Sequence, residues 1–164
     1  MKPAVLVVAS FAIALNVPVA QAQPAQARHF LVEAIQGDNS EITLGSLAER
    51  RGAAPGVRRF GAMLVRDHSH ARSEAVRVAR RLGIRPPASM MPQASRERAR
   101  LLRLRGRAFD REFVRYMVND HREDIDKFEE QARDRGQVAQ LAERTLPALR
   151  QHLQTAQSLE RQLG

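Results

Sequence analysis

Four long segments of the chain repeat apolar or small residues at alternating spacings of three and four, the period of an α-helix that buries one face. They cover about residues 28–50, 56–82, 107–134 and 137–162, and stretches that contain glycine or proline separate them. Runs of alternating β-branched residues, the usual signal of strands, are absent from the sequence. The sequence therefore predicts an all-α protein in which four helices pack as an antiparallel bundle.

A link of more than twenty residues joins the second and third predicted helices. It contains GIRPPASMMP at 83–92, which breaks a helix, and then SRERARLLRLRGR at 95–107, which predicts a short extra helix that is strongly basic. One side of this short helix carries Leu101, Leu102 and Leu104. The link is long enough to run the length of the bundle or to pack across one end. We expect the short helix to cover one end.

The first 22 residues have the pattern of a cleaved export signal. A lysine precedes the apolar run VLVVASFAIAL, and the small residues Ala20 and Ala22 stand where a signal peptidase cuts. The apolar run is shorter than the ~20 residues that a membrane-spanning helix needs. We therefore expect residues 1–22 to be removed and residues 23–164 to form one periplasmic domain, for which an association with the outer membrane stays open.

Charge and cysteine content narrow the kinds of partner and site. The chain has no cysteine, which excludes disulfides and thiolate metal ligands. Its formal net charge is +9, and arginine supplies almost all of the positive charge. In an exported protein this fits an anionic envelope surface and not nucleic acid. The segment from Arg96 to Arg107 is the candidate for that contact. The alternatives are that this segment only covers one end of the bundle and that the basic charge is a solvated face without a partner.

Each apolar stripe contains one strongly polar residue, and the four are Glu41, His68, His121 and His152. Glu41 lies about 13 residues before the first predicted turn and His68 about 14 after it, so at ~1.5 Å per residue both are roughly 20 Å from that end. His121 and His152 lie at matching distances, about 15 and 16 residues, on either side of the turn at Gly136. We therefore expect the four side chains to meet near the middle of the bundle.

One carboxylate and three imidazoles are a suitable ligand set for a divalent transition metal, here zinc, iron, manganese or copper. Asp67, Asp120 and Asp124 are predicted to be additional ligands or to hydrogen-bond the ligands from outside. The alternative is a metal-free network in which the four groups hydrogen-bond one another, since a buried polar group is costly without a partner. His70 comes two residues after His68 and is predicted to face solvent.

An ordered set of motifs resembles one bacterial family. The pieces are FLVEAIQG at 30–37 with Glu41 and Leu44 after it, VRDH at 65–68, GRAFD at 106–110, MVNDH at 117–121, Phe128, TLP at 145–147 and His152. Together they resemble domain of unknown function 4142, a family of exported ferritin-like helical bundles often labelled outer-membrane proteins. The resemblance implies a ferritin-like four-helix bundle and places the four polar residues at family positions, but it implies no reaction.

Three functional interpretations stay open. The first is a non-enzymatic protein that binds or buffers metal in the cell envelope, with a role in stress survival. The second is a structural or interaction module whose polar core holds no metal. The third is a metal-dependent redox enzyme, which we favour least, because a di-iron bundle needs Glu-x-x-His on two helices and the core stripes of this chain carry one glutamate.

Overall fold

The computed structural model describes residues 25–164, and the predicted export signal lies outside that range. The described residues form five helices, which are α1 (Ala25–Arg51), α2 (Pro55–Arg81), α3 (Pro92–Leu101), α4 (Gly106–Ala132) and α5 (Gln137–Leu163). They contain no strand, so the predicted all-α class is confirmed. Within the same range no helix combines the length and the apolar character that a membrane span requires.

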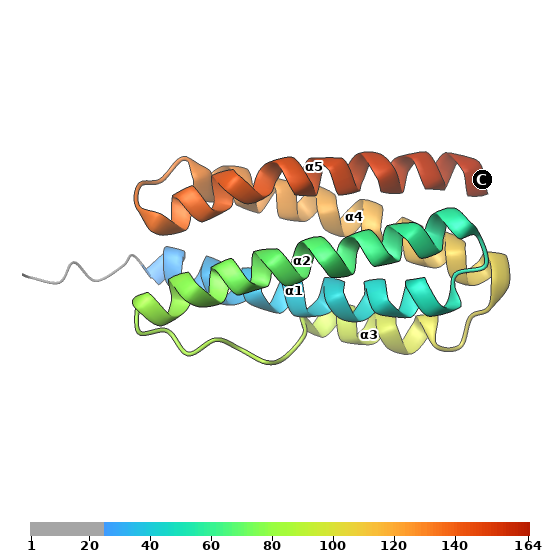
Figure 1. Cartoon of the computed structure of the whole chain (residues 1–164), viewed down its shortest axis with the longest axis horizontal. Coiled ribbons are helices and arrows are strands. Elements are labelled where there is room, and N and C mark those ends of the chain that lie inside the picture. The colour runs from blue at the N-terminus through green and yellow to red at the C-terminus, as the bar shows by residue number, and fades with distance from the viewer. Residues whose placement is uncertain (1–24) are drawn as a thin grey trace, which may run out of the picture.

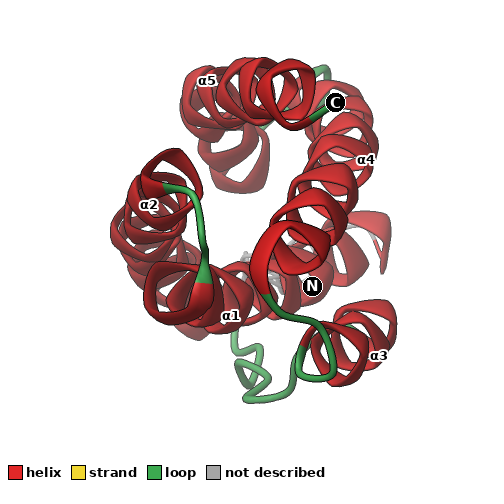
Figure 2. Ribbon diagram, turned by 90° about the vertical axis from the view of Figure 1, so that its right-hand side faces the viewer, coloured by secondary structure: helices red, strands yellow, loops and turns green. Residues whose placement is uncertain are grey.

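The four long helices form a bundle of two antiparallel hairpins. The α1–α2 turn lies at one end and the α4–α5 turn at the other, with α2 beside α5 and α1 beside α4 (Figures 1 and 2). The link from α2 to α4 runs back along the bundle and includes α3 (Figure 1). One long crossover of this kind is the ferritin-like connection, so the fold that the resemblance implied is confirmed.

The short helix α3 differs in place and extent from the prediction. It packs lengthwise on the outside of α1 and α4 and does not cover an end of the bundle (Figure 2). It begins at Pro92, whose ring fits the first turn of a helix, and it ends at Leu101. Leu101 is fully buried, whereas Leu102 is exposed. The apolar side of α3 is therefore narrower than the three leucines suggested.

Within residues 25–164 the hydrophobic core forms two clusters, one toward each end of the bundle. The cluster near the α1–α2 turn includes Leu44, Phe60, Leu64, Phe113 and Met117. The cluster near the α4–α5 turn includes Leu31, Ile35, Val78 and Leu141. The polar residues of the four stripes are all buried, and they are Glu41, His68, His121 and His152. Along each long helix, the polar residue stands between the residues that pack in one cluster and those that pack in the other. The four polar residues form a polar layer across the middle of the core.

A carboxylate from α4 holds the turn between α1 and α2. The N-terminus of α2 has no side-chain cap of its own at Ala54. Instead the backbone N–H groups of Ala53 and Ala54 donate to the two carboxylate oxygens of Asp110, at 2.9 and 2.7 Å. Asp110 is buried, and it therefore ties the two hairpins together at this end of the bundle.

We expect Asp110→Asn to lower the free energy of unfolding by about 2 kcal/mol, because one backbone donor loses a charged acceptor inside the protein. Urea unfolding followed by circular dichroism measures the change. Asp126→Asn, at an exposed position of the same helix, is the control and should change stability by less than about 0.5 kcal/mol. Equal stability of the two variants would show that the Asp110 hydrogen bonds contribute nothing.

Candidate metal centre

Three buried histidines from three helices meet in the polar layer. One ring nitrogen from each of His68 on α2, His121 on α4 and His152 on α5 lies within 4.8 Å of the others. The ring centroids are 5.2 to 5.9 Å apart. The convergence expected from the helix stripes is thus present for the three imidazoles.

The outer nitrogens of two of these rings face hydrogen-bond acceptors. His121 Nδ1 lies 3.0 Å from the carbonyl oxygen of Met117, one turn earlier in α4. Because a carbonyl only accepts, His121 carries its proton on Nδ1, and Nε2 presents a lone pair. His68 Nδ1 lies 2.9 Å from Asp38 Oδ1 and donates to that carboxylate in the same way. His68 Nε2 then faces inward and has no hydrogen-bond partner among the described residues.

The ring of His152 follows the same pattern, except that Nε2 is its outer nitrogen and Nδ1 its inner one. His152 Nε2 donates to Asp67 Oδ2 at 3.0 Å, so Nδ1 is the inner nitrogen. That inner nitrogen lies 3.3 Å from His121 Nε2. All three rings therefore turn an N–H outward and a lone pair inward. Three lone pairs that face one another can share a cation, and carboxylates or carbonyls behind metal-bound histidines fix the rings in this orientation.

Glu41 belongs to a second group that overlaps the first. Its carboxylate is 1 % exposed, and neither oxygen has a hydrogen-bond partner within residues 25–164. A ligand atom of Glu41 lies within 4.8 Å of one from Asp120 and one from His121. Instead of a single set of four ligands, the structure therefore brings together a group of three histidines and a group with two carboxylates, and the groups share His121.

Burial dominates the acid–base behaviour of the layer. It raises the pKa of Glu41 well above its usual range, and the neighbouring Asp120, Asp124 and Asp38 raise it further. Burial, together with the charge of Asp120, also raises the pKa of Asp124 to about 7. In contrast, burial and the other two histidines lower the pKa of His121 well below its usual range, which keeps this imidazole in the neutral form that metals bind.

The remaining sequence-predicted residues take different places. Asp67 is partly exposed and hydrogen-bonds His152 from outside, as predicted for one of its two roles. Burial alone would raise the pKa of Asp67, but the contacts with His152 and Arg66 outweigh burial and lower it. Asp124 lines a cavity next to the histidines. His70 is exposed and lies 4.0 Å from Glu74, so it faces solvent as predicted.

Asp38 is a site residue that the sequence analysis did not single out. It is buried and accepts the hydrogen bond of His68. Burial raises its pKa, although the hydrogen bond to His68 opposes that shift. The sequence did contain a signal for this residue. Asp38 precedes Glu41 by three positions, and residues three apart on a helix share a face.

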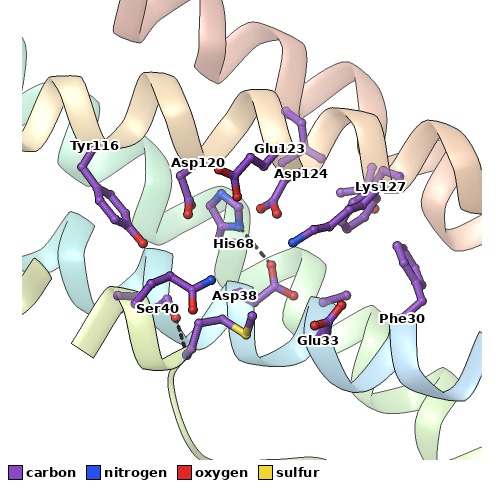
Figure 3. A pocket seen from close by; sticks show the side chains of 18 residues that line it. Phe30, Glu33, Asp38, Ser40, His68, Tyr116, Asp120, Glu123, Asp124 and Lys127 are labelled. Carbon is purple, nitrogen blue, oxygen red and sulfur yellow. Dashed lines mark hydrogen bonds and ion pairs between the residues drawn. The ribbon is translucent and has the colours of Figure 1, made fainter. Parts of the chain in front are cut away.

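A cavity of about 30 Å³ connects this layer to the surface between α1 and α4, and such a volume is enough for a water molecule or an ion. Figure 3 shows Asp120 and Asp124 side by side on its α4 wall, with Asp38 and His68 close to them. The exposed Lys127 lines its outer part. Carboxylates thus line the path from solvent to His68.

A family model described as a domain of unknown function, DUF4142, matches residues 15–159. The chain belongs to the DUF4142 family. Among solved structures, a crystal structure titled as a DUF305 fragment from Deinococcus radiodurans is similar to this DUF4142 chain, with a TM-score of 0.74. The two are 20 % identical, and the match covers 84 % of this chain and 97 % of the other. At that identity the likeness shows the fold alone. The comparison with curated proteins found no match.

Proposed function

We propose that this DUF4142 protein binds a divalent transition metal through His68, His121 and His152, with Glu41 as the neighbouring carboxylate. The observation that carries the proposal is the direction of the three N–H groups, which all point away from the centre of the triad. Three neutral imidazoles are a ligand set that zinc accepts with one position left open, and iron, manganese and copper also bind imidazole.

A metal-free network accounts less well for the same contacts. Such a network needs a donor for every acceptor, because unpaired polar groups in a core cost free energy. Here the inner nitrogens are acceptors, and His68 Nε2 and both oxygens of Glu41 have no partner among the described residues. A divalent cation at the triad would satisfy the three inner nitrogens, and its charge would also favour the ionised form of the neighbouring Glu41.

The proposal is for binding or buffering of metal and not for a reaction. We further propose that the protein works in the cell envelope, which rests on the signal-like pattern of residues 1–22. An anionic envelope surface is the proposed partner of the region around α3, because Arg96, Arg98 and Arg103 are all exposed there. Leu101 is used inside the bundle, so this contact would be electrostatic and would not involve insertion.

We expect the untagged protein to bind zinc and His68→Ala to weaken zinc binding about 100-fold or more, because the variant removes a ligand and leaves Asp38 without its donor. Isothermal titration with Zn²⁺ measures the affinity, and elemental analysis of protein from metal-replete cells identifies the native ion. His70→Ala is the matched control, since it removes an exposed histidine of the same helix. A folded protein that takes up no zinc, iron, manganese or copper would overturn the proposal.

A further inference from the structure

We propose that Glu41 and Asp120 hold a second cation beside the three-histidine group, so that the centre of the bundle takes two ions. The inference rests on the proposed function for the first ion. The second ion would be a hard divalent cation of the class of Mn²⁺, because the new position offers carboxylate oxygens.

The first support is the isolation of the Glu41 carboxylate. Glu41 on α1 and Asp120 on α4 approach each other within the protein, and neither oxygen of Glu41 has a hydrogen-bond donor among the described residues. None of the ion pairs formed within residues 25–164 includes Glu41, Asp120 or Asp124. Two carboxylates in this position repel each other when both are ionised, so the pair must either hold a proton or bind a cation, and a cation allows both to be ionised.

The second support is that the histidine triad does not use Glu41. The three inner ring nitrogens already form a group without it, and only His121 also lies within the carboxylate group. An ion at the triad would therefore leave Glu41 and Asp120 facing each other. Because the two groups share His121, two ions bound here would be close neighbours.

The third support is access. The cavity between α1 and α4 reaches Asp120 and Asp124, and both side chains point into it (Figure 3). Asp124 could therefore contribute an oxygen, either directly or through a water molecule held in the cavity. The two positions would differ in preference, since oxygen donors favour manganese or magnesium and imidazoles favour zinc or copper. This asymmetry differs from the repeated Glu-x-x-His pattern of di-iron bundles.

The test is a titration of the metal-free protein with Mn²⁺ alone, followed by electron paramagnetic resonance. We expect two bound ions per chain and an exchange-coupled spectrum from the neighbouring pair. Glu41→Gln should bind one ion, with an uncoupled spectrum, because the amide has lost the charge while keeping the shape. Asp126→Asn, an exposed α4 variant with the same loss of charge, should keep two coupled ions.

Other outcomes separate the two proposals. One ion in the wild type that is lost in Glu41→Gln would overturn the second site and place Glu41 in a single site with the histidines. Two coupled ions in Glu41→Gln would also overturn the second site. No bound ion in a folded wild type would overturn the proposed function as well. Circular dichroism melting of each variant shows that a lost ion does not result from a lost fold.

Discussion

Gly61→Ala is expected to lower the free energy of unfolding by about 3 kcal/mol, the upper end of the usual cost of overpacking. A Cβ atom at Gly61 would lie 2.5 Å from the carbonyl oxygen of Gly45 and 2.6 Å from the backbone nitrogen of Glu49. Both neighbours are backbone atoms of α1, so no side chain can rotate away. The helices α1 and α2 would have to move apart along their whole contact. Urea unfolding of the two proteins measures the difference.

Gly37→Ala is the matched control for this prediction. A Cβ atom there would meet only Asp124 Oδ2, at 4.0 Å, which is an ordinary contact. Because alanine is the better helix former by about 1 kcal/mol, we expect this variant to be as stable as the wild type or more so. Equal stability of Gly37→Ala and Gly61→Ala would contradict the close approach of the two helices.

The same approach of α1 and α2 positions the metal centre. Gly45 lies about one turn after Glu41, and Gly61 lies about two turns before His68. The contact between the glycines therefore sets how far apart these two side chains are held. Gly61→Ala should consequently weaken zinc binding as well as stability, whereas Gly37→Ala should leave zinc binding unchanged.

The helix periods and the turn positions made most of the fold predictable. A stripe that recurs every three or four residues can bury itself only as a helix, so the four long helices lie close to their predicted ranges. Because the rise per residue is constant, the depth of each histidine followed from its distance to a turn. This is why His68, His121 and His152 were predicted to meet, and they do.

The spacing of residues along the helices does not determine the finer arrangement of the side chains. Helix rotation and side-chain rotamers decide which ring nitrogen faces inward, and they separate Glu41 from the triad and place it with Asp120. Asp38 was missed because it flanks the apolar stripe of α1 and does not interrupt it. The course of α3 was open for a different reason, since a link without a periodic pattern fits several routes along a bundle.

Glu41→Gln is expected to make the metal-free protein more stable by about 2 kcal/mol at pH 7, because the raised pKa of Glu41 makes the wild type take up a proton when it folds, and the amide has no such cost. The amide is uncharged at every pH, and its N–H can donate to the nearby Asp120 carboxylate, whereas the wild-type carboxyl can donate only while it holds a proton. Urea unfolding in the presence of a chelator measures this gain. Glu49→Gln, at an exposed position of α1, is the control and should show no gain.

The sign of the pH dependence follows from the raised pKa of Glu41, which burial and Asp120 cause. Near pH 4 the carboxyl is largely protonated in both the folded and the unfolded chain, so the wild type and the variant should differ least. As the pH rises above 4.5, the usual pKa of a glutamate, the unfolded chain loses this proton first, and the wild type loses stability relative to the variant. The gap should therefore widen from pH 4 to pH 7.

Bound metal should reverse the order of stability of the wild type and Glu41→Gln. A cation that binds the folded chain stabilises it by about 4 kcal/mol at a thousandfold excess over the dissociation constant. Saturating Mn²⁺ should stabilise the wild type more than Glu41→Gln, because the wild type offers the charged carboxylate. If Glu41→Gln instead destabilises the metal-free protein, the carboxylate has a donor within the protein, and the metal-free network becomes the better account of the core. A variant that is more stable without metal and gains less from metal would assign Glu41 to metal binding.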